Sequence, residues 1–343
     1  MFELRNQSPF AAQLLPSLTV DGAETALVVV KGTYEIPVGT TLRIADQQVP
    51  LTLADEYYGD PEDSCIRYAS DIVPEKKGTD VVLIGSAHAL QGNAISLKVT
   101  LEAGPLRSAM AIVGDRHWQK SMLLGLHASD PMPFVSMPLV YERAFGGHDQ
   151  THPEPKKWAV ESRNPVGRGL IANPARPDFT NVLLPNLEDP SDLVVNARVR
   201  PKPVGFGYIA PRWVPRVHYA GTYDERWRET RFPLLPVDFD PRFFNNAHPD
   251  LISPSYFVGG ESVRLTNASR DGILEFHVPE VDVVATFYID GSVTEKPCNL
   301  DTIVIEPDQR RFTLTWRASA NCHRKVKYVT GARVNHSNRR VKL

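Results

Sequence analysis

Two groups of side chains in the sequence have the chemistry for catalysis or metal binding. The first lies in the segment YERAFGGHDQTH, where His148 and His152 stand four residues apart. Glu142 and Asp149 are close enough in sequence to add ligands. Histidines at this spacing share a metal ion only when the segment is helical. A glycine pair before the histidines and two prolines after them disfavour a helix, so we do not expect a metal site or a cofactor.

The second group contains the acids Asp224, Glu225, Glu229, Asp238 and Asp240. A buried pair of such acids could perform general acid–base chemistry. Arg226, Arg228 and Arg231 lie within a few residues of three of these acids, close enough for bidentate ion pairs. We favour ion pairs within the chain. The alternative, in which some of these arginines face a carboxylate of a partner, stays open.

These acids belong to the stretch from Gly205 to Ala247, which has the composition of a binding surface. It holds ten aromatic residues and six arginines beside the five acids. Tyr, Trp and Arg are enriched at the anchors of protein interfaces, and a ring beside a guanidinium offers both stacking and bidentate pairing. The predicted partner-binding anchors are Trp213, Arg216, Tyr223, Trp227 and Arg231. The alternative is a structured loop whose rings fill a small core of their own.

Motifs and composition exclude several classes of function. The sequence has no GxSxG, HExxH or SxxK motif, so no catalytic residue is predicted. A net charge of -2 provides no basic field for nucleic acid or anionic membranes, and neither is expected as a partner. The three cysteines lack CxxC spacing, and no signal peptide or long apolar span is visible. These features predict a cytoplasmic protein with reduced cysteines.

Short strands dominate the two ends of the sequence. Residues 1–128 are expected to form an antiparallel N-terminal β module, with strand signals at 26–44, 80–90, 94–102, 107–114 and 117–126 and a turn at Pro37–Gly39. Residues 255–343 are expected to add strands that pack with the rest, as a second sheet or as return strands of the first. Asp290–Gly291 and Pro307–Asp308 are predicted turns. The basic segment from His323 is predicted to be a solvated, partly frayed tail.

Proline organises the middle of the chain. Of the 29 prolines, 19 fall between Pro131 and Pro254, which excludes long helices and central strands there. The interval is also rich in aromatic residues, so residues 129–254 are predicted to be ordered but irregular, with a few single-turn helices. The predicted fold is therefore mainly β, with antiparallel, sandwich-like sheets joined by a long Pro- and aromatic-rich region containing little helix.

Several uncommon motifs in this chain resemble a known bacterial family. They include YERAFGG, NPVGRG, LPNLEDP, GFGYIAPRW, GTYDERW and LPVDFDPRFFNNA, with VVVKGTYEI, KKGTDVVLIGSAHA and NLDTIVIEPDQRRFTLTWRA in the expected order. The family, of formerly unknown function, is encoded in type VI secretion clusters beside spike proteins, PAAR-like tip proteins and toxic effectors. Motif residues expected to be structural are Tyr141, Glu142, Arg143, Phe145, Gly146, Gly147, Asn164, Pro165, Gly167, Gly169, Asp238, Asp240 and Arg242.

The resemblance implies a cytoplasmic adaptor or chaperone that binds a cognate effector and helps to load it onto the spike or PAAR-like tip. It implies no enzyme activity. A rival hypothesis is a carbohydrate-active or metal-dependent enzyme on a β-sandwich that uses acids and rings of the central region. A third is binding at the N-terminal sheet edge by strand addition.

Overall fold

The structure, a computed structural model, describes residues 2–36, 42–123, 125–173, 181–323 and 326–338. It is mainly β with mostly antiparallel sheets, which confirms the predicted fold class. The one α-helix among the described residues, α1 (Glu225–Thr230), has six residues. A helix needs about 20 residues to span a bilayer, so none in the described part of the chain is long enough to cross a membrane.

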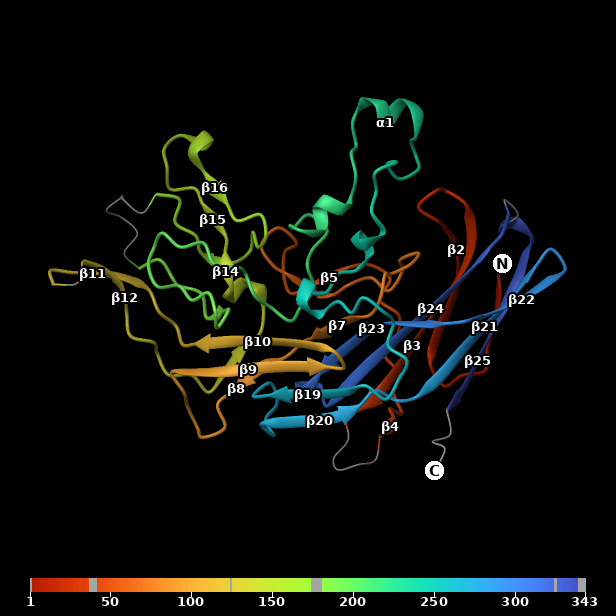
Figure 1. Cartoon of the computed structure of the whole chain (residues 1–343), viewed down its shortest axis with the longest axis horizontal. Coiled ribbons are helices and arrows are strands. Elements are labelled where there is room, and N and C mark those ends of the chain that lie inside the picture. The colour runs from red at the N-terminus through yellow and green to blue at the C-terminus, as the bar shows by residue number, and fades with distance from the viewer. Residues whose placement is uncertain (1, 37–41, 124, 174–180, 324–325, 339–343) are drawn as a thin grey trace.

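A central sheet combines strands from both ends of the chain (Figure 1). Its order is β2–β3–β24–β23–β7, with β4 beside β3. The strands are β2 (Ala11–Leu18), β3 (Glu24–Glu35), β4 (Arg43–Ile44), β7 (Asp80–Leu83), β23 (Asn299–Glu306) and β24 (Arg311–Asn321). β3 runs antiparallel to β24, and β7 runs parallel to β23. The unbroken apolar run from Leu27 to Val30 matches the burial of β3 on both faces.

A second sheet, on the left in Figure 1, has the order β18–β10–β9–β19–β20. Its strands are β9 (Ser96–Ala103), β10 (Leu106–Val113), β18 (Leu187–Glu188), β19 (Ser262–Thr266) and β20 (Ile273–His277). In β20, buried Leu274 and Phe276 alternate with exposed residues. Period-two alternation of this kind places one face of the strand on the core and the other in solvent.

A third sheet, on the right in Figure 1, has the order β1–β25–β21–β22. Its strands are β1 (Glu3–Asn6), β21 (Val281–Ile289), β22 (Ser292–Pro297) and β25 (Val329–Asn338). Asp290 and Gly291 both have positive φ between β21 and β22, which confirms the predicted two-residue turn. The predicted turn at Pro307–Asp308 is also confirmed, since the short 3₁₀ helix η6 (Pro307–Gln309) links β23 to β24.

Strand β25 shows that the prediction of a frayed basic tail was wrong for residues 329–338. This segment pairs with both β1 and β21. Val329, Ala332 and Val334 are buried, so the apolar residues between the polar ones hold the segment in the sheet. The basic composition of the segment from His323 was a poor guide because Arg333 is the only Lys or Arg within β25, and the other Lys and Arg residues stand on either side of this strand in the sequence.

All three large sheets contain strands from the first 128 residues and strands that follow Pro254. The C-terminal strands thus complete the central and second sheets and, together with β1, build the third. The boundaries proposed at residues 128 and 254 remain predictions. The turn expected at Pro37–Gly39 lies outside the described residues.

Short strand pairs complete the architecture and support the central region. They are β5 (Glu56–Tyr57) with β6 (Ile66–Tyr68), β8 (Ser86–His88) with β13 (Ser136–Pro138), β11 (Trp118–Ser121) with β12 (Gly125–Ala128), β14 (Phe145–Gly146) with β17 (Arg168–Gly169), and β15 (His148–Asp149) with β16 (Ala159–Val160). The strand signal at 80–90 is divided between β7 and β8, because β8 leaves the central sheet to pair with β13.

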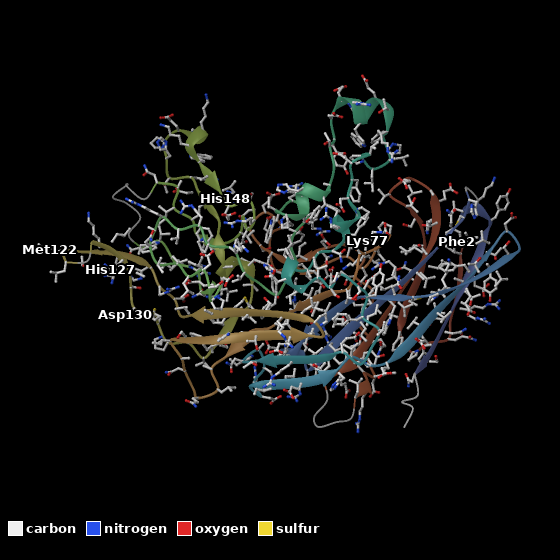
Figure 2. All side chains as sticks on the ribbon, viewed as in Figure 1. Phe2, Lys77, Met122, His127, Asp130 and His148 are labelled. Atoms are coloured by element: carbon white, nitrogen blue, oxygen red, sulfur yellow. The ribbon has the colours of Figure 1, made fainter. Side chains whose placement is uncertain are left out.

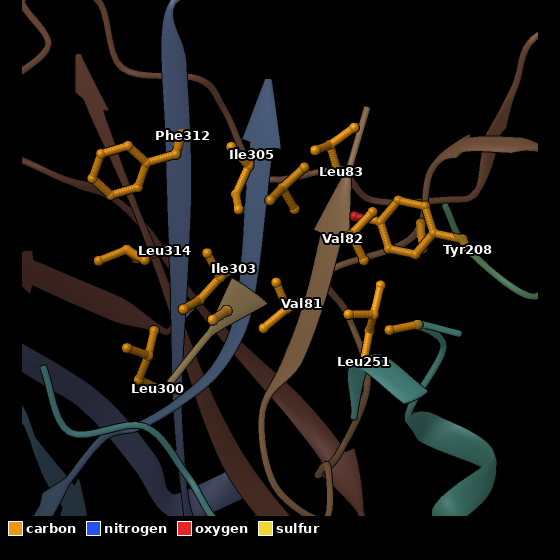
Figure 3. Close-up of a cluster of buried hydrophobic side chains, with 14 of the residues drawn as sticks. Val81, Val82, Leu83, Tyr208, Leu251, Leu300, Ile303, Ile305, Phe312 and Leu314 are labelled. Carbon is orange, nitrogen blue, oxygen red and sulfur yellow. The ribbon is translucent and has the colours of Figure 1, made fainter. Parts of the chain in front are cut away.

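The described part of the central region is ordered without long regular elements, as predicted. Short 3₁₀ helices punctuate it, namely η1 (Tyr141–Arg143), η2 (Pro155–Lys157), η3 (Arg216–Tyr219), η4 (Pro241–Phe244) and η5 (Pro249–Leu251). Figure 3 shows side chains of β7 and β23 between Phe312 and Leu314 of β24 on one side and Tyr208 and Leu251 on the other. The central region therefore covers the β7 end of the central sheet and shares its core.

Candidate functional site

The motifs YERAFGG and NPVGRG pack against each other at the start of the central region. β14 pairs in parallel with β17, and Asn164 is fully buried between them. The Asn164 side-chain amide donates to the carbonyls of Tyr141 at 2.8 Å and Phe145 at 3.0 Å. These two bonds tie the 3₁₀ turn at Tyr141–Arg143 to β14.

Close backbone contact explains the glycines of these two motifs. A Cβ on Gly146, at φ +153°, would lie 2.1 Å from the Asn164 carbonyl oxygen. A Cβ on Gly167 would lie 2.4 Å from the Asn164 amide nitrogen. The other expected motif positions in this junction are Gly147, Gly169 and the half-buried Pro165. The glycines of YERAFGG and NPVGRG thus allow the two motifs to pack tightly against each other.

The charged residues of YERAFGG also make contacts inside the protein. Glu142 accepts a hydrogen bond from the backbone N–H of Cys65 at 2.8 Å. Arg143 donates to the side-chain oxygen of Asn186 at 3.0 Å, and Arg168 donates to the Glu142 carbonyl at 2.9 Å. These side chains connect the junction to its neighbours.

A buried polar network ties the central region to the central sheet. Lys76 Nζ lies 2.7 Å from Asp80 Oδ2 and donates to Thr302 Oγ1 at 2.9 Å. Asp80 also accepts from the Asn245 side chain and from the Asn246 backbone N–H, each at 2.9 Å. A buried charge is costly unless it is paired and hydrogen-bonded. The network therefore fixes the Asn245–Asn246 segment on the sheet.

Two more buried ion pairs lie on the same sheet. Lys31 Nζ is 2.8 Å from Asp71 Oδ2, and Arg317 Nε is 2.9 Å from Asp301 Oδ2. Arg317 also donates to the Asp71 carbonyl at 2.9 Å, which connects the two pairs. Burial raises the pKa of Asp301, while the neighbouring guanidinium opposes that rise. None of the three buried ion pairs was predicted from the sequence. Five of their six residues nevertheless stand in motifs that carry the family resemblance, namely Lys31, Lys76, Asp80, Asp301 and Arg317.

Residues 221–238 form a projection that we call the α1 arm, because it carries α1 away from the sheets (Figure 1). Asp238 closes its base by accepting from the Thr222 backbone N–H at 3.0 Å and the Thr222 hydroxyl at 2.7 Å. These bonds hold the pKa of Asp238 below its ordinary value. Gly221, at φ +78°, allows the close approach of the two ends of the arm.

Caps and ring contacts order the arm, since a helix of six residues has little stability of its own. Asp224 caps α1 by accepting from the Trp227 backbone N–H at 2.8 Å. The Trp227 indole donates to the Leu234 carbonyl at 2.8 Å. The Arg231 guanidinium donates to the Leu235 carbonyl at 2.8 Å. A Cβ on Gly22 would lie 2.8 Å from Leu234, so the arm rests on the β2–β3 turn.

The arm presents an aromatic triad consisting of Tyr223, Trp227 and Phe232. The Trp227 ring lies edge-on to Tyr223 at 4.7 Å and to Phe232 at 5.7 Å between centroids. Tyr223 is 52% exposed and Phe232 is 66% exposed, with Val237 nearby in sequence at 85%. The prediction included Tyr223, Trp227 and Arg231 but missed Phe232, although Phe232 stands in the same aromatic-rich stretch.

The other two predicted anchors are buried below the arm. Trp213 is 6% exposed and packs edge-on against Tyr141 at 5.5 Å. Arg216 is 7% exposed and donates to the carbonyls of Phe243 at 2.8 Å and Ile209 at 2.9 Å. Burial lowers the pKa of Arg216. Both residues therefore expose little surface and support the segment that carries the arm, although Arg216 also lines a pocket at its base.

Four of the five acids of the stretch bond to separate neighbours. Glu225 accepts two hydrogen bonds from Arg228, at 2.9 and 2.8 Å, which is one of the ion pairs predicted within the chain. Arg231 differs from the prediction, since its bonds go to backbone carbonyls. Asp240 accepts from Arg242 Nε at 2.8 Å, and the guanidinium lies over the Tyr219 ring at 4.5 Å. Asp224 and Asp238 hold the arm, as described above. These four acids therefore do not converge on one reacting position.

The histidine segment has a different arrangement. His148 lies exposed in β15, and His152 Nδ1 accepts from the backbone N–H of Glu154 at 3.0 Å. In the residues that the structure describes, no three His, Cys, Asp or Glu side chains are grouped so that they could hold a metal ion. All three cysteines are free thiols.

The fold and this site define a β-rich protein with a projecting aromatic arm. The chain belongs to the family described as "Uncharacterized protein conserved in bacteria (DUF2169)", whose model matches residues 21–317. Searches of curated proteins and of solved structures found no match. The part of the resemblance that concerns type VI secretion remains a prediction.

Proposed function

We propose that this chain is an adaptor that binds a partner protein through the aromatic triad of the α1 arm. The proposed partner is a cognate toxic effector of a type VI secretion system, bound in the cytoplasm and delivered to the spike or PAAR-like protein. The motif resemblance supports this choice of partner. No enzyme activity is part of the proposal.

The observation that carries the proposal is a packed cluster of three rings on an ordered projection, in which Tyr223 and Phe232 are exposed and Trp227 is half-buried between them. Large apolar side chains gathered at the surface are typical of interaction sites. Tyr and Trp also give large contact areas with few rotatable bonds. The cap at Asp224 and the bond from the Trp227 indole hold the rings in place before binding. Such preorganisation lowers the entropy cost of association.

Co-expression with the effector encoded beside this gene tests the proposal. With the wild-type chain, the effector should become soluble and should co-purify. In a second chain, residues 223–237 are replaced by two glycines, because Thr222 and Asp238 already lie within hydrogen-bonding distance. This armless variant should keep the sheets, as checked by circular dichroism, and should lose the effector.

A matched control is the Met122→Ala/Leu123→Ala variant, which removes two exposed apolar side chains from the β11–β12 hairpin. Met122 lies far from the α1 arm in Figure 2. This variant should retain the effector. An effector that is insoluble and unbound beside the wild-type chain contradicts the adaptor proposal, and full retention by the armless variant contradicts the placement of the site.

A further inference from the structure

A cationic pocket of about 320 Å³ lies where the α1 arm joins the body. We call it the root pocket, and its polar lining comprises Lys77, Arg216, Tyr219, Arg242 and Asn245. The remaining lining residues are apolar and include Ile209 and Ile252. The pocket adjoins the base of the arm, because the Tyr219 carbonyl accepts a hydrogen bond from the backbone N–H of Asp240 at 2.9 Å, and Asp240 is two residues beyond Asp238. Figure 2 places Lys77 below the arm.

Three cationic side chains line the root pocket, whereas none of its lining residues is acidic. Lys77 pairs with Glu75, and Arg242 pairs with Asp240, and both acids stand outside the lining. Arg216 differs because its bonds go to two backbone carbonyls. No ion pair in the described part of the chain involves its guanidinium. Asp55 and Asp80 act on Arg216 through their charge, but neither carboxylate is bonded to the guanidinium, so an anion in the pocket would give this buried cation a direct partner.

Arg216 lines the pocket and has donor capacity that its bonds to the described residues do not use. Nε and Nη1 make the two carbonyl bonds, and Nη2 has no hydrogen bond to the described residues. Guanidinium groups recognise carboxylates through directed, charge-assisted hydrogen bonds. The apolar walls of the pocket add a preference for a carboxylate that is accompanied by an apolar group.

The size of the pocket limits the ligand. Ligand pockets are usually about 300–1,000 Å³, so a volume of about 320 Å³ suits one or two side chains. Because the pocket lies beside the arm, a partner protein that contacts the aromatic triad could place a neighbouring segment in the pocket. A short acidic and apolar segment of a partner fits both constraints.

We propose that the root pocket binds the carboxylate of an acidic residue that stands next to an apolar residue in the protein docked on the α1 arm. This inference rests on the proposed adaptor function. It adds a specificity element, since the arm supplies apolar contact and the pocket selects negative charge.

The test uses the full chain and two peptide probes, acetyl-Leu-Glu-Leu-amide and its neutral counterpart acetyl-Leu-Gln-Leu-amide. Ligand-observed NMR titration measures the dissociation constant of each probe. The glutamate peptide should bind about tenfold more tightly, because its carboxylate makes charge-assisted hydrogen bonds. The Lys77→Gln/Arg242→Gln variant should reduce this preference to about twofold or less. Both substituted side chains are exposed, so folding should survive.

The Lys156→Gln/Lys157→Gln variant is a charge-matched control, because it removes two exposed cations from η2. It should keep the preference for the glutamate peptide. Equal binding of the two peptides, no binding of either, or an unchanged preference in Lys77→Gln/Arg242→Gln overturns the inference. If the peptides fail while the armless variant still loses the effector, the pocket assignment alone is wrong. If the glutamate peptide binds as expected but the wild-type chain does not retain the effector, the adaptor function is wrong.

Discussion

Replacement of Lys76 by methionine should strongly destabilise the protein. Lys76 and Asp80 are both buried, with 2.7 Å between Nζ and Oδ2. The Lys76→Met variant keeps two hydrogen-bond donors on Asp80, from Asn245 and Asn246, but leaves its charge without a cation at that distance. Breaking a buried pair in this way costs about 3–5 kcal/mol. This is a large share of a typical stability of about 5–15 kcal/mol.

A double variant separates the effect of the charge from the loss of packing. Asp80→Asn alone leaves the Lys76 ammonium buried without its carboxylate, so it should also be costly. In Lys76→Met/Asp80→Asn no charge remains, and the asparagine oxygen can still accept from the Asn246 backbone. The double variant should therefore lose about 1–3 kcal/mol less than the sum of the single variants.

Urea unfolding, followed by the fluorescence of the five tryptophans, measures these differences. With a slope of about 3 kcal/mol per M, a loss of 3 kcal/mol lowers the midpoint by about 1 M. Single variants that lose less than about 1 kcal/mol, or a double variant that is simply additive, would refute the view that this ion pair fastens the central region to the sheet.

Three further predictions concern packing, protonation and thiol reactivity. Gly146→Ala should cost about 2 kcal/mol or more in urea unfolding, because the new Cβ would lie 2.1 Å from a carbonyl oxygen, and a midpoint within error of wild type would contradict this. Burial lowers the pKa of His248 from 6.5, so only the unfolded state takes up its proton as the pH falls below about 6.5. Stability should decrease there, and His248→Gln should flatten that part of the pH profile, whereas an unchanged profile would exclude His248 as the cause. Burial raises the pKa of Cys298 to about 12 and also raises the pKa values of Cys65 and Cys322. A disulfide reagent that reacts with thiolates should therefore modify the native chain slowly at pH 8 and all three cysteines quickly in urea. A cysteine that reacts quickly in the native chain would contradict the burial described around it.

Local patterns predicted most of the strands but not their partners. The run at Leu27–Val30 and the Asp290–Gly291 turn depend on neighbouring residues, so their structure is visible in the sequence. The pairing of β3 with β24 joins segments almost 300 residues apart, and no local signal encodes it. The basic end of the chain was misjudged because its Lys and Arg residues were counted together, whereas most of them flank β25 and only Arg333 stands within it.

The candidate site was predicted in part for a similar reason. Composition located the aromatic-rich stretch, but it does not say which rings face solvent. Trp213 turns inward onto Tyr141, while Tyr223 projects from the arm. The Lys76–Asp80 network could not be foreseen as a unit, because Asn245 and Asn246 reach it from about 165 residues away along the chain.

The most direct test of the adaptor function is the equilibrium affinity of the purified chain for its purified effector. Tyr223→Ala/Phe232→Ala removes the two exposed rings of the triad, and Met122→Ala/Leu123→Ala is the matched control. Loss of true anchors should cost about 2 kcal/mol or more, which is about thirtyfold in the dissociation constant. We predict a dissociation constant about thirtyfold higher for the triad variant and an unchanged dissociation constant for the control. A folded triad variant that binds the effector as tightly as wild type would contradict the account.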